Sequence, residues 1–192
     1  MSNMFDRWPT VSYDLKKNGK PLELTNITLR FKINELLRDK SAVIYNIDVN
    51  NGERADIIAY KYYGDTKLDW VIFLVNNIID PQFEWPLDDR SFERYVKGKY
   101  GSLEKAKRTV HFYEKVLREQ QVHFDGTIIA KKSLRVDKET YDLTHPDSRR
   151  TVDKYTYEYE LNQQRSRIKL LDKRYLVGLL NTYSNIVNQS RI

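Results

Sequence analysis

Residues 42–96 change from one hydrophobic period to another, and this change limits the folds open to the chain. The segment first alternates apolar and polar residues, which is typical of a half-buried strand. After Asn50-Asn51-Gly52, apolar residues recur at the spacing of one face of a short helix. The apolar residues of the strand and of this helix are Val43, Tyr45, Ile47, Val49, Ala55, Ile58, Ala59 and Tyr62. We therefore expect a strand followed by a helix.

A second helix is expected directly after the first. Gly64 is placed to end the first helix, because glycine enters the left-handed cap without a steric cost at Cβ. Thr66 followed by Asp69 resembles a capping box and opens the second helix. The apolar face of that helix consists of Leu68, Val71, Ile72 and Val75. Asp80-Pro81 stops this pattern, and an aromatic stretch from Phe83 to Leu87 follows.

Residues 1–41 are expected to form an extended arm. Trp8-Pro9, Asn18-Gly19 and Lys20-Pro21 disfavour helix and favour turns or extended backbone. The arm nevertheless carries too many large apolar side chains for a free tail. Two interpretations stay open: the arm packs against its own domain, or it docks on another chain.

Residues 97–192 are expected to mix strands and helices. From residue 109 onwards apolar residues alternate, which predicts short strands, and Asp125-Gly126 is a favoured two-residue hairpin turn. The polar stretch 137–150 is expected to be a loop, and the tyrosine-rich stretch after it fits a strand or a helix equally well. A last helix is expected after Asp172. The predicted class is α+β, with an extended arm at 1–41, a strand–helix–helix unit at 42–96 and a mixed C-terminal region at 97–192.

The composition gives no sign of catalytic or metal chemistry. The chain has no cysteine, which excludes disulfides and thiolate-held metals. His111, His123 and His145 lack a full ligand set at the spacing of a metal site. Neither a nucleophile elbow nor a glycine-rich phosphate loop is present. We expect no enzyme, no cofactor, no bound metal and no small-molecule substrate.

Positive charge gathers in the second half of the chain. Residues 97–192 carry 20 Lys and Arg against 12 Asp and Glu, whereas residues 1–96 carry 13 against 15. Acidic residues intersperse the basic ones, which favours a solvated or protein-facing surface over a nucleic-acid stripe. No apolar run reaches the roughly 20 residues of a membrane span, and the N-terminal residues show no secretion signal. We therefore expect neither nucleic acid nor membrane as a partner.

The aromatic residues point instead to protein contacts. The chain contains 14 Tyr and 3 Trp, and these residue types together with Arg are enriched in protein–protein interfaces. We select candidate interface residues from the arm, from the aromatic stretch after the second helix and from the tyrosine-and-basic stretch near the C-terminus. They are Phe5, Trp8, Tyr13, Phe31, Phe83, Trp85, Tyr155, Tyr157, Arg165 and Arg167.

Several motifs, in the same order along the chain, resemble one known family. The central unit contains ADIIAYKYYGD, then DWVIFLVNN with Trp70, then Asp80-Pro81 and the aromatic stretch. The arm contains FDRWPTVSYD and LTNITLRF, and further along stand HFYE and YEYELNQQRSRIKLL. Together these motifs resemble the baseplate wedge protein family encoded by gene 53 of contractile-tailed phages, whose central part is LysM-like.

The resemblance implies a structural virion protein of the tail baseplate, assembled in the host cytoplasm. In that family the subunit helps to clamp neighbouring wedges into the six-fold ring around the tail hub. The implied partners are other wedge subunits: the scaffold proteins of the same and the neighbouring wedge, and the sheath-initiating subunit.

Two other functions stay open from the sequence. LysM modules bind N-acetylglucosamine polymers, so a peptidoglycan-binding module is the first alternative, although the short glycine- and proline-punctuated loops usual there are absent. A basic nucleic-acid-binding protein is the second, since tyrosines and basic residues are interleaved between Tyr155 and Arg174.

Overall fold

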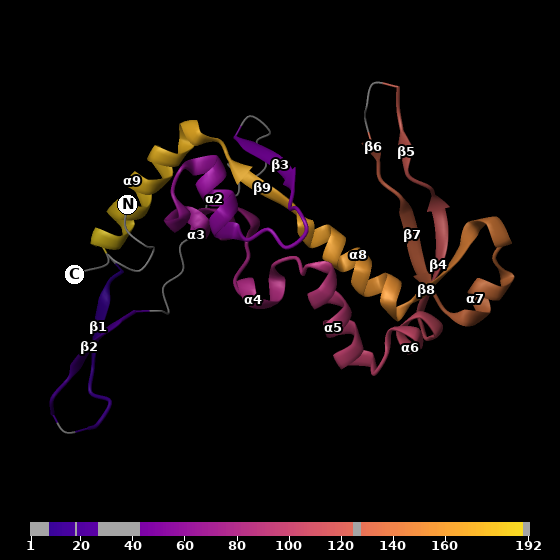
Figure 1. Ribbon diagram of the computed structural model, residues 1–192, viewed down its shortest axis with the longest axis horizontal. Coiled ribbons are helices and arrows are strands. Elements are labelled where there is room, and N and C mark those ends of the chain that lie inside the picture. Colours follow the sequence, from indigo (N-terminus) through magenta and orange to yellow (C-terminus); the bar gives the residue numbers. More distant parts are fainter. Residues whose placement is uncertain (1–7, 18, 27–42, 125–127, 190–192) are drawn as a thin grey trace. The chain divides into compact units, whose positions relative to one another are not determined.

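The chain forms two compact units, each with its own helices and small sheets (Figure 1). The computed structural model describes residues 8–17, 19–26, 43–124 and 128–189. Unit 1 comprises Met1–Pro86 and Arg165–Ile192, and unit 2 comprises Leu87–Gln164. The α+β class expected from the sequence is confirmed.

Unit 1 contains two antiparallel strand pairs and a group of helices. Its elements are β1 (Thr10–Tyr13), β2 (Leu22–Thr25), β3 (Ile44–Asp48), α2 (Ala55–Tyr63), the 3-10 helix η2 (Thr66–Leu68), α3 (Asp69–Asn76), α4 (Pro81–Glu84), β9 (Arg167–Leu171) and α9 (Lys173–Gln189). β1 pairs with β2, and β3 pairs with β9, a strand far away in the sequence. The strand and the two helices expected within 42–96 are β3, α2 and α3.

The two central helices are ended and started by local backbone chemistry. Gly64 ends α2 as expected, with φ 83° and its N–H donating to the carbonyl of Tyr60 at 2.9 Å. The cap that follows is Asp65 and not the expected Thr66, because its carboxylate accepts from the N–H of Lys67 at 2.9 Å. η2 begins at this point and leads directly into α3.

α2, α3, β9 and α9 share the core of unit 1. Val71, Ile72 and Val75 of α3 are fully buried, in agreement with the apolar face expected for this helix. On β9, Ile168 and Leu170 are buried on one face of the strand. Full burial of each such side chain contributes about 1.5–3 kcal/mol to stability. The core therefore joins the middle of the sequence to its C-terminal part.

Unit 2 combines helices with a three-stranded antiparallel sheet of order β7–β4–β8. Its elements are α5 (Asp89–Tyr100), α6 (Leu103–Arg108), β4 (Val110–Arg118), β5 (Gln121–Val122), β6 (Ile128–Ile129), β7 (Lys132–Val136), α7 (Lys138–Leu143), the 3-10 helix η3 (Pro146–Ser148), β8 (Arg149–Asp153) and α8 (Lys154–Ser166). β5 and β6 pair with each other and lengthen the β4–β7 hairpin. The expected turn at Asp125-Gly126 lies outside the described residues.

The expected loop at 137–150 is instead α7, η3 and the start of β8. Asp137 starts the helix, since its carboxylate accepts from the N–H of Glu139 at 3.1 Å and from that of Thr140 at 3.3 Å. A good cap thus makes a helix from a polar segment with little apolar pattern. The tyrosine-rich stretch, left open between strand and helix, is the helix α8.

The structure groups the chain differently from the three regions expected at 1–41, 42–96 and 97–192. β9 and α9 belong to unit 1, and residues 87–164 between the two parts of unit 1 form unit 2. The physical reason is the β3–β9 pairing. Such a long-range pairing leaves no signal in the local hydrophobic period.

Candidate protein–protein interface

The register of the β1–β2 hairpin gives it one apolar and one polar face. Val11 pairs with Leu24 and Tyr13 pairs with Leu22 across the two strands, so these four side chains share a face. We call them the apolar face of the hairpin. The opposite face carries Thr10, Ser12, Glu23 and Thr25. The hairpin is therefore amphipathic, as a strand pair is when one side rests on another protein surface.

The apolar face of the hairpin is uncovered. Its four side chains keep between 44% and 56% of their surface exposed, and none of them belongs to the core of unit 1 among the described residues. Covering the exposed half of such a side chain contributes roughly 1 kcal/mol. An isolated two-stranded hairpin is only marginally stable in water. Burial of this face against a partner would therefore stabilise the hairpin.

The loop of the hairpin is shaped by Asp14. Its carboxylate accepts a hydrogen bond from the N–H of Gly19 at 2.7 Å. Gly19 has φ 73°, a left-handed conformation that glycine adopts without a Cβ clash. This bond closes the loop between the two strands.

Trp8, one of the predicted interface residues, lies in the core of unit 1. Only 6% of its surface is exposed, and its ring lies 5.9 Å from that of Tyr183 on α9, which also contacts Trp70 at 5.0 Å. The indole N–H donates to the carbonyl of Asn26 at 2.5 Å, just after β2. Trp8 thus attaches the base of the hairpin to unit 1. The base of the arm therefore packs against its own domain, which was the first of the two interpretations left open.

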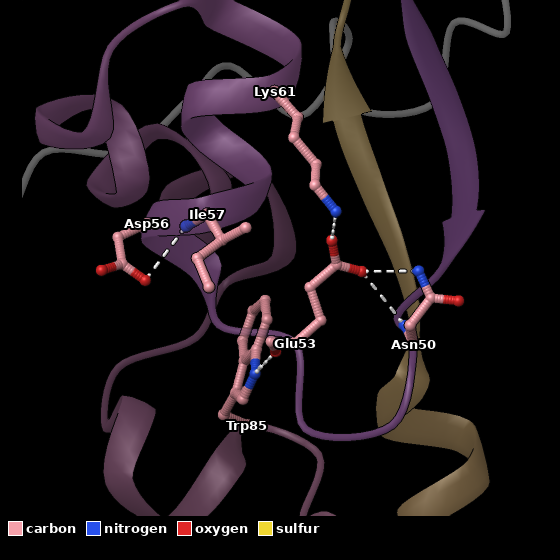
Figure 2. Close-up of polar contacts among 6 residues, drawn as sticks. All are labelled: Asn50, Glu53, Asp56, Ile57, Lys61 and Trp85. Carbon is pink, nitrogen blue, oxygen red and sulfur yellow. Dashed lines mark hydrogen bonds and ion pairs between the residues drawn. The ribbon is translucent and has the colours of Figure 1, made fainter.

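Phe83 and Trp85, two further predicted residues, differ in their surroundings. Phe83 on α4 is 70% exposed. Trp85 is half-buried, with its ring edge-on to Phe73 at 5.7 Å and its indole N–H donating to the carbonyl of Glu53 at 3.0 Å (Figure 2). Phe83 is therefore free for a partner, whereas Trp85 supports its own unit.

Glu53 links the turn after β3 to α2. Its carboxylate accepts from Lys61 at 2.6 Å and from the amide of Asn50 at 2.8 Å (Figure 2). The hydrogen bond from Lys61 is the main reason why the pKa of Glu53 lies below its usual value. Together with the indole of Trp85, these contacts hold the turn in place.

Tyr155 and Tyr157, predicted from the tyrosine-rich stretch, lie on α8 and contact other parts of unit 2. The ring of Tyr155 lies 5.6 Å from that of Phe92, at the edge of a small core. The ring of Tyr157 lies 4.2 Å from that of His111 on β4, and the guanidinium of Arg135 lies 5.9 Å from its centre. Both tyrosines are partly used in packing within unit 2.

The remaining predicted residues are two arginines and two phenylalanines. Arg165 is exposed near the end of α8. Arg167 begins β9 with 82% of its side chain exposed and lies 3.8 Å from the carboxylate of Asp48. Phe5 and Phe31 lie outside the described residues. The structure therefore leaves Tyr13, Phe83, Arg165 and Arg167 exposed.

Sequence reasoning missed a polar cluster around Glu158, a nearly buried carboxylate on α8. It accepts hydrogen bonds from Lys99 at 2.7 Å, from Tyr100 at 2.6 Å and from Tyr95 at 3.2 Å, all on α5. Burial alone would raise the pKa of Glu158, but the bonds from Lys99 and Tyr100 outweigh it and the pKa is lowered. The cluster fixes α8 to α5. In the sequence, its only signal was the four-residue spacing of Tyr95 and Lys99, which places both on one helix face.

The described residues contain no group of three or more His, Asp or Glu that could hold a metal ion. None of the helices in the described part of the chain combines the length and apolarity that crossing a membrane requires. The surfaces above leave apolar side chains uncovered on small α+β units, a feature typical of subunits of larger assemblies.

A comparison with protein families identifies that assembly. The model of the family named base plate wedge protein 53 matches residues 1–186. The chain belongs to this family, and it is a structural protein of the phage tail baseplate that meets other baseplate components. The comparison with curated proteins finds no match.

Proposed function

We propose that this chain clamps neighbouring wedges of the baseplate together, with its β1–β2 hairpin docked on a subunit of the adjacent wedge. The observation that carries the proposal is the apolar face of the hairpin, whose four side chains are about half exposed. Membership of the wedge family supplies the class of partner. The particular partners that we propose are the scaffold proteins of the same and the neighbouring wedge, and the sheath-initiating subunit.

A clamp needs a second contact surface, and unit 2 offers one at the β5 end of its long hairpin. Val122 is 66% exposed and Phe124 is fully exposed. Apolar side chains at the end of a projecting hairpin are favourable contact points, because burial removes them from water without rebuilding the unit. We assign this end to the chain's own wedge, with assembly in the host cytoplasm.

The test is the replacement of Leu22 and Leu24 by serine in one double variant. Because both side chains are exposed, the variant is expected to fold like the unchanged protein. After co-expression with the other wedge subunits, it should join its own wedge but no longer link wedges into rings, as measured by sedimentation velocity. Thr25→Ser on the polar face is the matched control and should form rings normally. Rings in normal yield from the double variant would refute the proposed docking.

A further inference from the structure

The outer edge of β9 is covered by two side chains of its own unit. The side-chain amide of Asn76 accepts from the N–H of Lys169 and donates to its carbonyl, both at 2.8 Å. The hydroxyl of Tyr63 accepts from the N–H of Leu171 at 3.0 Å and donates to its carbonyl at 3.1 Å. Each side chain bonds to the backbone N–H and C=O groups of one β9 residue, as a neighbouring strand would otherwise do. β9 therefore has no free edge at these two positions.

The β3–β9 ladder determines which backbone groups of β3 are left over. The N–H of Val49 donates to the carbonyl of Ser166, and the N–H of Asp172 donates to that of Val43, both at 2.8 Å. In an antiparallel pair, residues facing the partner strand alternate with residues facing away. The odd-numbered residues of β3 therefore bond to β9, and the even-numbered ones point outward.

The outward residues of β3 are Ile44, Asn46 and Asp48. Among the residues that the structure describes, none forms a hydrogen bond with their backbone N–H and C=O groups. Asn46 and Asp48 are also exposed. Open strand edges attract other strands, so proteins usually cover them. In the described part of the chain, one edge of this two-stranded sheet is covered and the other is open.

We propose that β3 accepts an extended segment of another wedge subunit as a third strand. The groups left open are backbone donors and acceptors at the spacing of a strand ladder, and these fit an extended backbone. That the segment comes from a wedge subunit rests on the proposed function. Three outward residues offer up to six hydrogen-bonding groups, enough for a short segment.

The side chains of β3 indicate which residue types the added segment should carry. Tyr45, 49% exposed, and Ile47 lie on one face of the strand, whereas the partly buried Ile44 and the exposed Asn46 and Asp48 lie on the other. The added strand should therefore alternate, with apolar residues beside Tyr45 and Ile47 and polar residues beside Asn46. Asp48 already lies 3.8 Å from Arg167 of its own chain, but its side chain is 80% exposed, so its carboxylate can also accept a hydrogen bond from a donor on the added strand.

A second copy of this chain fits the edge poorly. Two β3 strands paired antiparallel about Asn46 would place Ile44 of one copy opposite Asp48 of the other, an apolar side chain against a charge. Each chain also has a net charge of +6, which opposes self-association. The occupant is therefore a different chain.

Amide hydrogen exchange at residue resolution tests the inference on the full chain, alone and in complex with co-expressed wedge subunits. In the free chain, the amides of Ile44, Asn46 and Asp48 should exchange fast and those of Tyr45 and Ile47 slowly. In the complex, the three outward amides should slow by at least about tenfold. A complex that forms with those amides unprotected overturns the added strand and leaves the proposed function standing. Protection that rises with the concentration of the chain alone would show self-pairing and would also overturn it.

Asn46→Pro provides a variant that acts on the outer edge. Proline at this position removes an outward N–H and no bond to β9, a placement that edge strands tolerate. We expect affinity for the wedge partner to fall at least about tenfold, while Asn46→Ala, which keeps the N–H, binds within about twofold of the unchanged chain. Asp48→Pro serves the same purpose if the first variant does not fold. Equal affinity of a folded proline variant and its alanine control for the wedge partner would refute the proposal.

Discussion

The side-chain amide of Asn76 bonds to both backbone groups of Lys169, at 2.8 Å each, and also donates to the carbonyl of Ile72 at 2.8 Å. One side chain of α3 thus completes a strand that is far away in the sequence. Both N–H donors of its side-chain amide and one acceptor position of its oxygen are used in this arrangement.

Asn76→Ala should lower the free energy of unfolding by about 2 kcal/mol, because it removes three hydrogen bonds and leaves the groups of Lys169 without partners. Urea unfolding followed by circular dichroism measures the change. Asn46→Ala is the control, since its side chain is exposed and should change stability by less than about 0.5 kcal/mol. Equal stability of the two variants would contradict this role of Asn76.

Trp8→Ala should lower the free energy of unfolding by about 3 kcal/mol, because Trp8 is buried against Tyr183. Tyr13→Ala, on the exposed face of the same hairpin, should change it by less than about 0.5 kcal/mol. Chemical denaturation of both variants gives the comparison. A small effect at Trp8 would mean that this residue is free for a partner, as the sequence first suggested.

Gly64 and Gly98 form a matched pair of glycines with opposite expected effects. Gly64→Ala should destabilise the protein by about 1 kcal/mol, because φ 83° disfavours any Cβ. Gly98 lies inside α5 with open space around it, so Gly98→Ala should stabilise the protein by about 0.5–1 kcal/mol. Thermal unfolding midpoints should therefore move in opposite directions. A shift of both midpoints in the same direction would contradict the opposite effects expected for the two glycines.

Glu158 should make the stability of unit 2 depend on pH. Its pKa in the folded protein lies below the ordinary 4.5, so the folded state prefers the ionised carboxylate more than the unfolded state does. This stabilisation is complete above about pH 4.5 and is lost as the pH falls through the folded-state pKa.

Glu158→Gln should therefore lower the free energy of unfolding by about 1–2 kcal/mol at pH 7 and by less as the solution is acidified. Urea unfolding at several pH values tests this. Glu93→Gln is the control, because Glu93 pairs with Lys97 on the exposed side of α5 at 3.6 Å and such pairs contribute little. A difference that grows towards low pH would reverse the assigned sign.

The sequence was most informative where structure is set by neighbouring residues. The strand β3, the helices α2 and α3 and the end of α2 at Gly64 follow from hydrophobic period and cap chemistry. The helix α7 was missed because a capping aspartate, with almost no apolar pattern, determined it. The return of β9 to β3 depends on contacts between distant segments, which no local period encodes.

The candidate interface was predicted only in part for the same reason. Large aromatic residues suggested a contact surface, yet Trp8 and Trp85 contribute to their own unit, while Tyr13 and Phe83 stay exposed. Exposure of an aromatic side chain depends on which distant segment covers it. The open edge of β3 could not be predicted from the sequence either. Which strand edge is covered depends on side chains of α2 and α3, and these bond to β9 and not to β3.

The return of β9 to β3 also sets an order of events during synthesis on the ribosome. Unit 2 is continuous in sequence, so all of its residues have been translated before β9 appears. Until then, the nascent β3 lacks β9, the strand with which it pairs, and the helices beside it lack the strand that closes their core. A message truncated before Arg167 would therefore yield a finished unit 2 joined to an unclosed unit 1.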